Sequence, residues 1–279
     1  MLIYSLAPLL GLFLFGLIIG SFLNVVIYRL PLQMRRAWGE TNLPEMNIAW
    51  PASHCPSCQT PLRWWHNLPL ISWLALKGRC GFCAADIPLR YPLVELSAGL
   101  LAVLLVAQLG WGWTSFAWVA WSWVLLTLLM IDWQEYLLPD VLTLPLLWAG
   151  LILHWLTGSD LQFDQAFLGA ILGYLSLWSL YWLFKLLTGR EGMGFGDFKL
   201  LAALGAWLGA PALLPIIMLS ALSGLLLALL IKLKKQWQNQ PLAFGPHLIL
   251  AALAVKLGGW PLMEALQLGD WLRLTGWAF

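Results

Sequence analysis

Long apolar runs dominate the pattern of hydrophobic and polar positions along this chain. The first covers residues 1–28, which contain no charged side chain. Seven more follow at residues 92–109, 114–131, 141–156, 166–188, 198–209, 212–231 and 243–258. A helix needs about 20 apolar residues to cross the roughly 30 Å hydrocarbon core of a bilayer, and most of these runs approach that length. The pattern predicts an all-α polytopic membrane protein with about eight transmembrane helices, the run at 198–209 being short enough for a half-helix.

One long polar stretch separates the first run from the others. Residues 29–90 hold seven of the 15 basic residues and all four cysteines. We therefore divide the chain into a first transmembrane helix (1–28), a small extramembrane domain (29–90) and a membrane domain of about seven further helices (91–279). The first run lacks the basic start and short apolar core of a secretory signal, so we interpret it as a retained helix. Its Gly16 and Gly20 form a GxxxG pair, which is typical of close helix packing.

Composition supports a membrane protein and excludes several function classes. Hydrophobic residues make up 61% of the chain and charged residues only 10%, whereas soluble proteins are nearer a quarter charged. So few charges cannot cover a water-exposed surface or form a basic patch for nucleic acid. A soluble nucleic-acid-binding protein, a secreted miniprotein and a disordered chain are excluded. We expect contact with membrane lipid and no nucleic-acid partner.

The basic residues predict how the chain is oriented. If the 29–90 domain is cytoplasmic, 13 of the 15 Lys and Arg residues lie on that side, and only Lys256 and Arg273 lie on the other. Basic residues accumulate on the cytoplasmic side of membrane proteins. The pattern therefore predicts a multi-pass protein whose 29–90 domain is cytoplasmic and whose two termini lie on the opposite face.

The four cysteines form two CxxC pairs, Cys55 with Cys58 and Cys80 with Cys83. Two tight turns that each carry two thiolates provide the tetrahedral sulfur ligands that zinc favours. Two disulfides are the alternative, but they require an oxidising compartment. Because we expect this domain in the cytoplasm, we favour a structural zinc ion. His54 and His66 lie nearby, and we do not expect either to be a ligand while four cysteines are available.

Two aspartates lie where apolar runs end on the predicted cytoplasmic side. Asp132 begins the segment DWQEYLLPD, and Asp197 lies in GMGFGDFKLL. Acidic residues at a membrane span are costly to bury and mark functional sites. Two carboxylates that meet in a low-dielectric pocket can share a proton, so that one activates water and the other polarises a peptide carbonyl. The residues alone leave alternatives: a proton-coupled carrier that uses the same pair, helix caps, or a non-catalytic zinc-domain scaffold.

Other residues near these aspartates carry weaker signals. We expect the glycines at 192, 194 and 196 to permit unusual backbone angles and close approach of another segment. Asp140 follows Pro139 at the start of a predicted helix, where we expect it to be the N-cap. Glu95 lies where the second apolar run begins and is either a functional acid or one that snorkels to the interface.

In their order along the chain, these motifs resemble the prepilin peptidases, the bifunctional leader peptidases and N-methyltransferases of type IV pili and type II secretion. The resemblance is carried by GSFLNVVIYRLP (20–31), HCPSCQTPLRWWHNLPLISWL (54–74), RYPLVEL (90–96), the Asp132 segment and GMGFGDFKLLAALGAWLG (192–209). It extends from about residue 20 to residue 235.

The resemblance implies an eight-helix enzyme of the bacterial inner membrane, with residues 91–279 as its peptidase domain. Its catalytic aspartates map to Asp132 and Asp197, and its GxGD glycines to Gly194 and Gly196. Such an enzyme cleaves type IV prepilins and pseudopilins after a glycine on the cytoplasmic side of their hydrophobic segment. It then methylates the new N-terminal residue, usually phenylalanine, with S-adenosylmethionine. The chain has no glycine-rich nucleotide loop after a predicted strand, so the residues that bind this cofactor stay unassigned.

Overall fold

The computed structural model of this chain describes residues 6–158, 163–233 and 242–266. In these residues the regular structure is helical, and extended backbone pairs only in two isolated bridges. The chain divides into two compact units, Met1–Thr127 and Leu128–Phe279. Each unit is described by itself below.

Six helices in the described residues are long and apolar enough to cross a membrane. They are α1 (Leu6–Ala37), α3 (Arg90–Leu109), α4 (Trp113–Glu135), α5 (Asp140–Thr157), α6 (Phe163–Thr188) and α8 (Ala210–Leu233). Two more apolar helices occupy the remaining predicted runs, α7 (Phe195–Leu208) and α9 (Gly245–Ala265). The backbone of α9 is non-helical at Gly259. The prediction of a polytopic all-α membrane protein is confirmed.

The first helix is longer than the apolar run that predicted it. It continues through Arg29 to Ala37, which gives 32 residues and a length of about 48 Å at 1.5 Å per residue. Arg35 and Arg36 lie in its last turn, where positive charge favours the C-terminal end of a helix. An apolar run marks the part of a helix that can lie in the hydrocarbon core of a membrane. The helix itself can continue beyond the end of the run.

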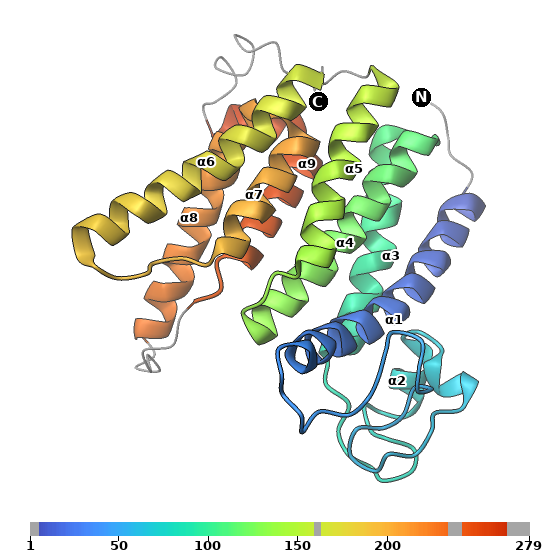
Figure 1. Cartoon of the computed structure of the whole chain (residues 1–279). Helices are drawn as coiled ribbons and strands as arrows, with labels where there is room; N and C mark the ends of the chain where they lie inside the picture. The colour runs from blue at the N-terminus through green and yellow to red at the C-terminus, as the bar shows by residue number, and fades with distance from the viewer. Residues whose placement is uncertain (1–5, 159–162, 234–241, 267–279) are drawn as a thin grey trace. The chain divides into compact units, whose positions relative to one another are not determined.

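In the first unit, α1 packs against α3 through the predicted GxxxG pair. A methyl group on Gly16 would lie 2.6 Å from the Cα of Gly99, and one on Gly20 would lie 2.6 Å from the Cα of Glu95. These glycines therefore bring the two backbones together, and Gly20 brings Glu95 against α1. Between the two helices, residues 38–89 form mostly turns, with a 3-10 helix (Trp64–Asn67) and α2 (Ile71–Ala75) (Figure 1).

The centre of the second unit is α7. This helix has only 14 residues, about 21 Å, which is short of the roughly 30 Å hydrocarbon core. It packs against α5, α6, α8 and α9, as Figure 1 shows, and all residues from 200 to 208 are buried. A helix that is apolar on every side is one that other helices surround. The short run at 198–209 is therefore a core helix.

The contact between α6 and α7 depends on two glycines, Gly169 and Gly205. A methyl group on either one would collide with the backbone carbonyl of the other. Because backbone atoms cannot move aside as a flexible side chain can, any larger residue forces the two helices apart.

We predict that Gly205→Ala destabilises the second unit by about 1–3 kcal/mol, the usual effect of overpacking a well-packed core. The melting temperature of the purified protein in detergent would fall. Gly11→Ala is the matched control, because a methyl group there meets no atom within 4 Å. Equal melting temperatures for the two variants would contradict the close α6–α7 contact.

Candidate active site and metal centre

Asp132 and Asp197 are both buried in the second unit. Asp132 lies near the C-terminal end of α4, Asp197 lies in the first turn of α7, and the two residues are only 5% and 7% exposed. The charge of Asp132 acts on the Asp197 carboxylate. The fold therefore brings together the two aspartates that the sequence singles out.

The GxGD motif is the start of α7. Gly194 is the N-cap residue, and Asp197 is the third residue of the helix. The backbone N–H of Gly194 donates a hydrogen bond to the Asp197 carboxylate. Asp197 thus occupies the third helical position, from which a side chain can reach the N-cap backbone. The spacing of the motif follows from this geometry.

The partner of Asp132 is Gly245, the first residue of α9. The backbone N–H of Gly245 donates a hydrogen bond to the Asp132 carboxylate. A methyl group on Gly245 would collide with a carboxylate oxygen of Asp132 and lie 3.3 Å from Cδ1 of Leu138. Each buried carboxylate thus accepts a bond from the N-terminal end of a helix, where the backbone carries partial positive charge.

The expectation that the glycines around Asp197 adopt unusual backbone angles is wrong. Gly194 is extended, and in this part of the chain only Gly189 has a positive φ. The expectation of close approach is confirmed at Gly196, where a methyl group would lie 2.8 Å from Cβ of Leu138. Gly196 is therefore needed for space beside the connection between α4 and α5.

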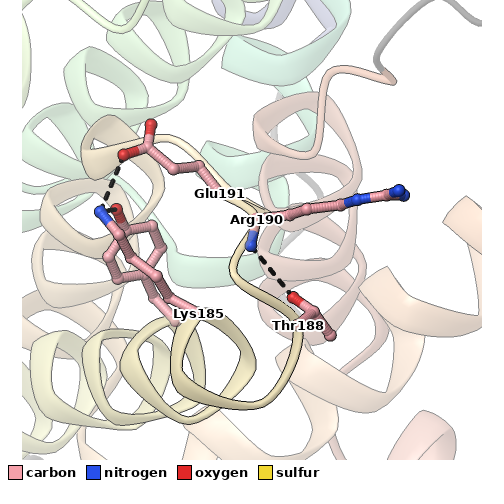
Figure 2. Close-up of polar contacts among 5 residues, drawn as sticks. Lys185, Thr188, Arg190 and Glu191 are labelled. Atoms are coloured by element: carbon pink, nitrogen blue, oxygen red, sulfur yellow. Dashed lines mark hydrogen bonds and ion pairs between the residues drawn. The ribbon is translucent and has the colours of Figure 1, made fainter.

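Figure 2 shows how the loop before α7 is held by the end of α6. Lys185 Nζ lies 2.9 Å from Oε1 of Glu191 and donates a hydrogen bond to the Tyr181 hydroxyl at 3.2 Å. The hydrogen bond from Lys185 holds the pKa of Glu191 below its ordinary value. The Tyr181 ring in turn packs against Phe195, with centroids 5.2 Å apart. These contacts fix the chain just before Asp197.

The prediction that Asp140 is an N-cap is wrong. The N-cap of α5 is Pro139, and Asp140 lies in the first turn without a capping bond. Its two carboxylate oxygens lie 2.8 and 2.7 Å from Nζ of Lys199 in α7. Lys199 attracts the carboxylate away from the backbone, and the ion pair joins the starts of α5 and α7.

The carboxylate pair is suited to acid–base chemistry. Two negative charges cannot both be accommodated easily in a buried site, so the pair favours holding one proton between its members. The ionised carboxylate can accept a proton from water while the protonated one donates to a carbonyl oxygen.

The four cysteines converge in the first unit. The sulfur atoms of Cys55, Cys58, Cys80 and Cys83 all lie within 4.8 Å of one another. The Sγ atoms of Cys55 and Cys83 are 3.9 Å apart. Four zinc–sulfur bonds of about 2.3 Å in a tetrahedron place the sulfur atoms roughly 3.8 Å apart, so the donor atoms fit a four-sulfur zinc site.

Two equivalent turns build this cluster. The Gln59 N–H donates to the Cys55 carbonyl at 2.8 Å, and the Ala84 N–H donates to the Cys80 carbonyl at 2.9 Å. An isolated bridge closes each turn, at residues 54 and 61 and at residues 79 and 86. Hydrogen bonds from the side chain and backbone of Thr60 lower the pKa of Cys58 to about 6. The thiolate is the form of cysteine that binds metal, so this lowered pKa favours metal binding at Cys58.

Comparison with known proteins also divides the chain into two regions, although the second region begins within α4, before the start of the second unit at Leu128. The model of the type IV leader peptidase family matches residues 119–229, and the model of the bacterial peptidase A24 N-terminal domain matches residues 14–109. The prepilin leader peptidase/N-methyltransferase of Aeromonas salmonicida (strain A449) is 50% identical over 261 residues, covering 88% of this chain and 89% of that protein. The proteins of the same name from Pseudomonas aeruginosa and Neisseria gonorrhoeae are 46% and 44% identical, with at least 92% of each chain covered. The chain belongs to the type IV leader peptidase family. No solved structure matches it.

This family membership confirms the resemblance that the motifs indicated. The leader peptidase region contains Asp132 and Asp197, but it ends before Gly245, which sequence reasoning missed. The sequence signal for Gly245 is its place in Gly245-Pro246, because proline is favoured in the first turn of a helix.

The N-terminal domain of this leader peptidase also ties its irregular segment to the helices. Arg29 is buried and donates hydrogen bonds to three backbone carbonyls, those of Asn47 at 2.9 Å, Ile48 at 3.3 Å and Pro51 at 2.7 Å. Arg29 therefore organises the backbone of this segment. Glu95 is also buried rather than extended to the interface, and it accepts a hydrogen bond from the Leu70 N–H at 2.8 Å.

Proposed function

We propose that this leader peptidase cleaves type IV prepilins and pseudopilins after a glycine and then methylates the new N-terminal residue. The observation that carries the peptidase half is the buried pair of Asp132 and Asp197, each with a helix N-terminus as its hydrogen-bond donor. The family and the names of its relatives support both halves.

Cleavage follows from one shared proton. The ionised aspartate accepts a proton from water as the water oxygen attacks the carbonyl carbon of the scissile bond, and the protonated aspartate donates its proton to the carbonyl oxygen. The tetrahedral intermediate then collapses and its C–N bond breaks. A hydroxyl proton of the intermediate passes to the aspartate that is now ionised, and the proton that the other aspartate took from water moves to the leaving amine. The pair again holds one proton. Binding of the substrate's apolar helix among the membrane helices positions the bond at the carboxylates.

We place the protein in the bacterial inner membrane, with the 29–90 domain in the cytoplasm and both termini in the periplasm. The distribution of Lys and Arg supports this orientation. It puts the ends of α4 and α7 that carry the aspartates on the cytoplasmic side, where the proposed cleavage takes place.

We further propose that Cys55, Cys58, Cys80 and Cys83 hold a structural zinc ion. Their convergence and the two matching turns support this assignment. Four thiolates complete a tetrahedral set and leave no position for water or substrate, so the ion would stabilise the irregular segment rather than take part in the reaction.

The methylation step needs a donor of an electrophilic methyl group, for which we propose S-adenosylmethionine. The lone pair of the new N-terminal amine attacks the methyl carbon while the carbon–sulfur bond breaks with its electrons on sulfur. The products are S-adenosylhomocysteine and the N-methylated chain, which loses a proton to solvent.

Replacing either aspartate tests the peptidase assignment. We expect Asp132→Asn and Asp197→Asn each to lower the cleavage rate at least about 10²–10⁴-fold, because an amide cannot accept and return the proton. The assay incubates the purified protein with a prepilin, with and without S-adenosylmethionine, and reads product size and N-terminal mass. Glu45→Gln is the control and retains cleavage, since this exposed acid lies in the first unit and pairs with Arg36. Cleavage at the wild-type rate by either active-site variant would refute the assignment.

Gly245→Ala tests the contact with Asp132. The added methyl group displaces the carboxylate, so we expect kcat to fall by a factor of about 10–100 while the protein stays folded in detergent. Gly224→Ala is the matched control in the same unit, because a methyl group there makes only ordinary contacts with His247. An unchanged kcat for Gly245→Ala would show that Asp132 does not depend on this helix end.

Metal analysis tests the zinc proposal. We expect one equivalent of zinc in the purified protein and substantial loss of it in Cys58→Ser or Cys83→Ser, because a hydroxyl is a poor zinc ligand. His54→Ala should retain the full equivalent. Less than half an equivalent of zinc in the wild-type protein, with no reactive thiols, would instead indicate disulfides.

A further inference from the structure

The first unit contains a cavity of about 550 Å³ that the proposed cleavage does not use, and Cys55 and Cys80 of the cysteine cluster lie at its wall. Sites for small molecules and cofactors typically measure roughly 300–1,000 Å³. The cavity is bounded by α1, by the start of α3 and by the irregular segment between these helices. Its lining includes Ser21, Asn24, His66, Trp73, Tyr91 and Glu95.

Glu95 gives this cavity a buried negative charge. Its exposed fraction is 9%, and it accepts hydrogen bonds from the Leu70 N–H and the Ser21 side chain. In the described part of the chain, no Lys or Arg forms an ion pair with it. The Arg29 guanidinium, which also lines the cavity, is bonded to three backbone carbonyls. Because a buried charge requires a partner, the cavity favours a ligand that carries positive charge.

Other lining groups fit a cationic ligand with polar substituents. Trp73 and Tyr91 provide aromatic rings, and such rings attract cations, including those of ligands. The Arg90 guanidinium already lies 5.0 Å from the centroid of the Tyr91 ring, so we assign the ligand cation to Trp73. Nδ1 of His66 is buried and, within the described residues, has no hydrogen-bond partner. Buried polar atoms of native proteins are nearly always paired, so this nitrogen indicates a missing polar group.

We propose that this cavity is the binding site of S-adenosylmethionine and that the Glu95 carboxylate attracts its positive charge. The inference rests on the proposed function, which requires this donor. The donor carries a sulfonium and an ammonium group, aromatic adenine and ribose hydroxyls, which match the carboxylate, aromatic and polar groups of the lining. The cavity also lies wholly within residues 14–109, the A24 N-terminal domain, outside the region that matches the leader peptidase family.

Binding measured without any prepilin tests the site. Isothermal titration of the full-length, zinc-containing protein in detergent with S-adenosylmethionine gives Kd for the wild type and for two variants. Glu95→Gln keeps an acceptor for Leu70 but removes the charge, and we expect Kd to rise at least about tenfold. Val25→Phe adds bulk beside the cavity without changing a polar group, and we expect a similar loss. Glu45→Gln, an exposed acid of the same segment that does not line the cavity, should bind as the wild type does.

Prepilin cleavage and zinc content report whether each variant is folded, and both should stay at the wild-type level. Wild-type Kd values for both Glu95→Gln and Val25→Phe would overturn the inference while leaving the proposed methylation intact. No binding and no methylation by the wild-type protein would instead refute the methyltransferase half of the proposed function, and the inference with it. Hydrogen–deuterium exchange of the wild type provides a test without substitutions. We expect the donor to protect residues 66–73 and 88–95, and protection confined to other segments would overturn the site.

Discussion

Burying two carboxylates next to each other inside an apolar helix bundle is the constraint on which the second unit depends. A buried negative charge is unfavourable, and a second one beside it more so. The molecule meets this constraint with backbone N–H groups at the starts of two helices, Gly194 for Asp197 and Gly245 for Asp132. Among the described residues no Lys or Arg forms an ion pair with either aspartate, so backbone dipoles stabilise the pair without neutralising it.

This arrangement explains several features of the surrounding helices. The short α7 begins where the carboxylates lie, and a helix start offers backbone N–H groups that have no partner within the helix. Gly169 and Gly205 let α6 approach α7 at backbone distance, and Gly196 leaves room for Leu138. The ion pair between Lys199 and Asp140 joins two further helix starts. Small residues and polar contacts thus set the positions of helix ends, which in turn set the positions of the carboxylates.

The first unit solves a different problem, because residues 38–89 contain little regular structure. Two similar CxxC turns bring four sulfur atoms together. Buried Arg29 of α1 and buried Glu95 of α3 form hydrogen bonds with backbone groups of this segment. Family comparison assigns this unit and the carboxylate pair to separate regions.

The amino-acid sequence predicts the helices and the residue types that matter chemically. Apolar runs predict the helices because hydrophobic length is a local property, and the GxGD spacing contains its own capping geometry, since Gly194 and Asp197 belong to one helix turn. The CxxC spacing is local in the same way.

Tertiary structure alone decided which distant groups these residues meet. Gly245 lies more than 100 positions from Asp132, Lys199 lies 59 positions from Asp140, and Leu70 lies 25 positions from Glu95. No pattern along the chain encodes such pairings, because they depend on how whole helices pack and on where each one ends.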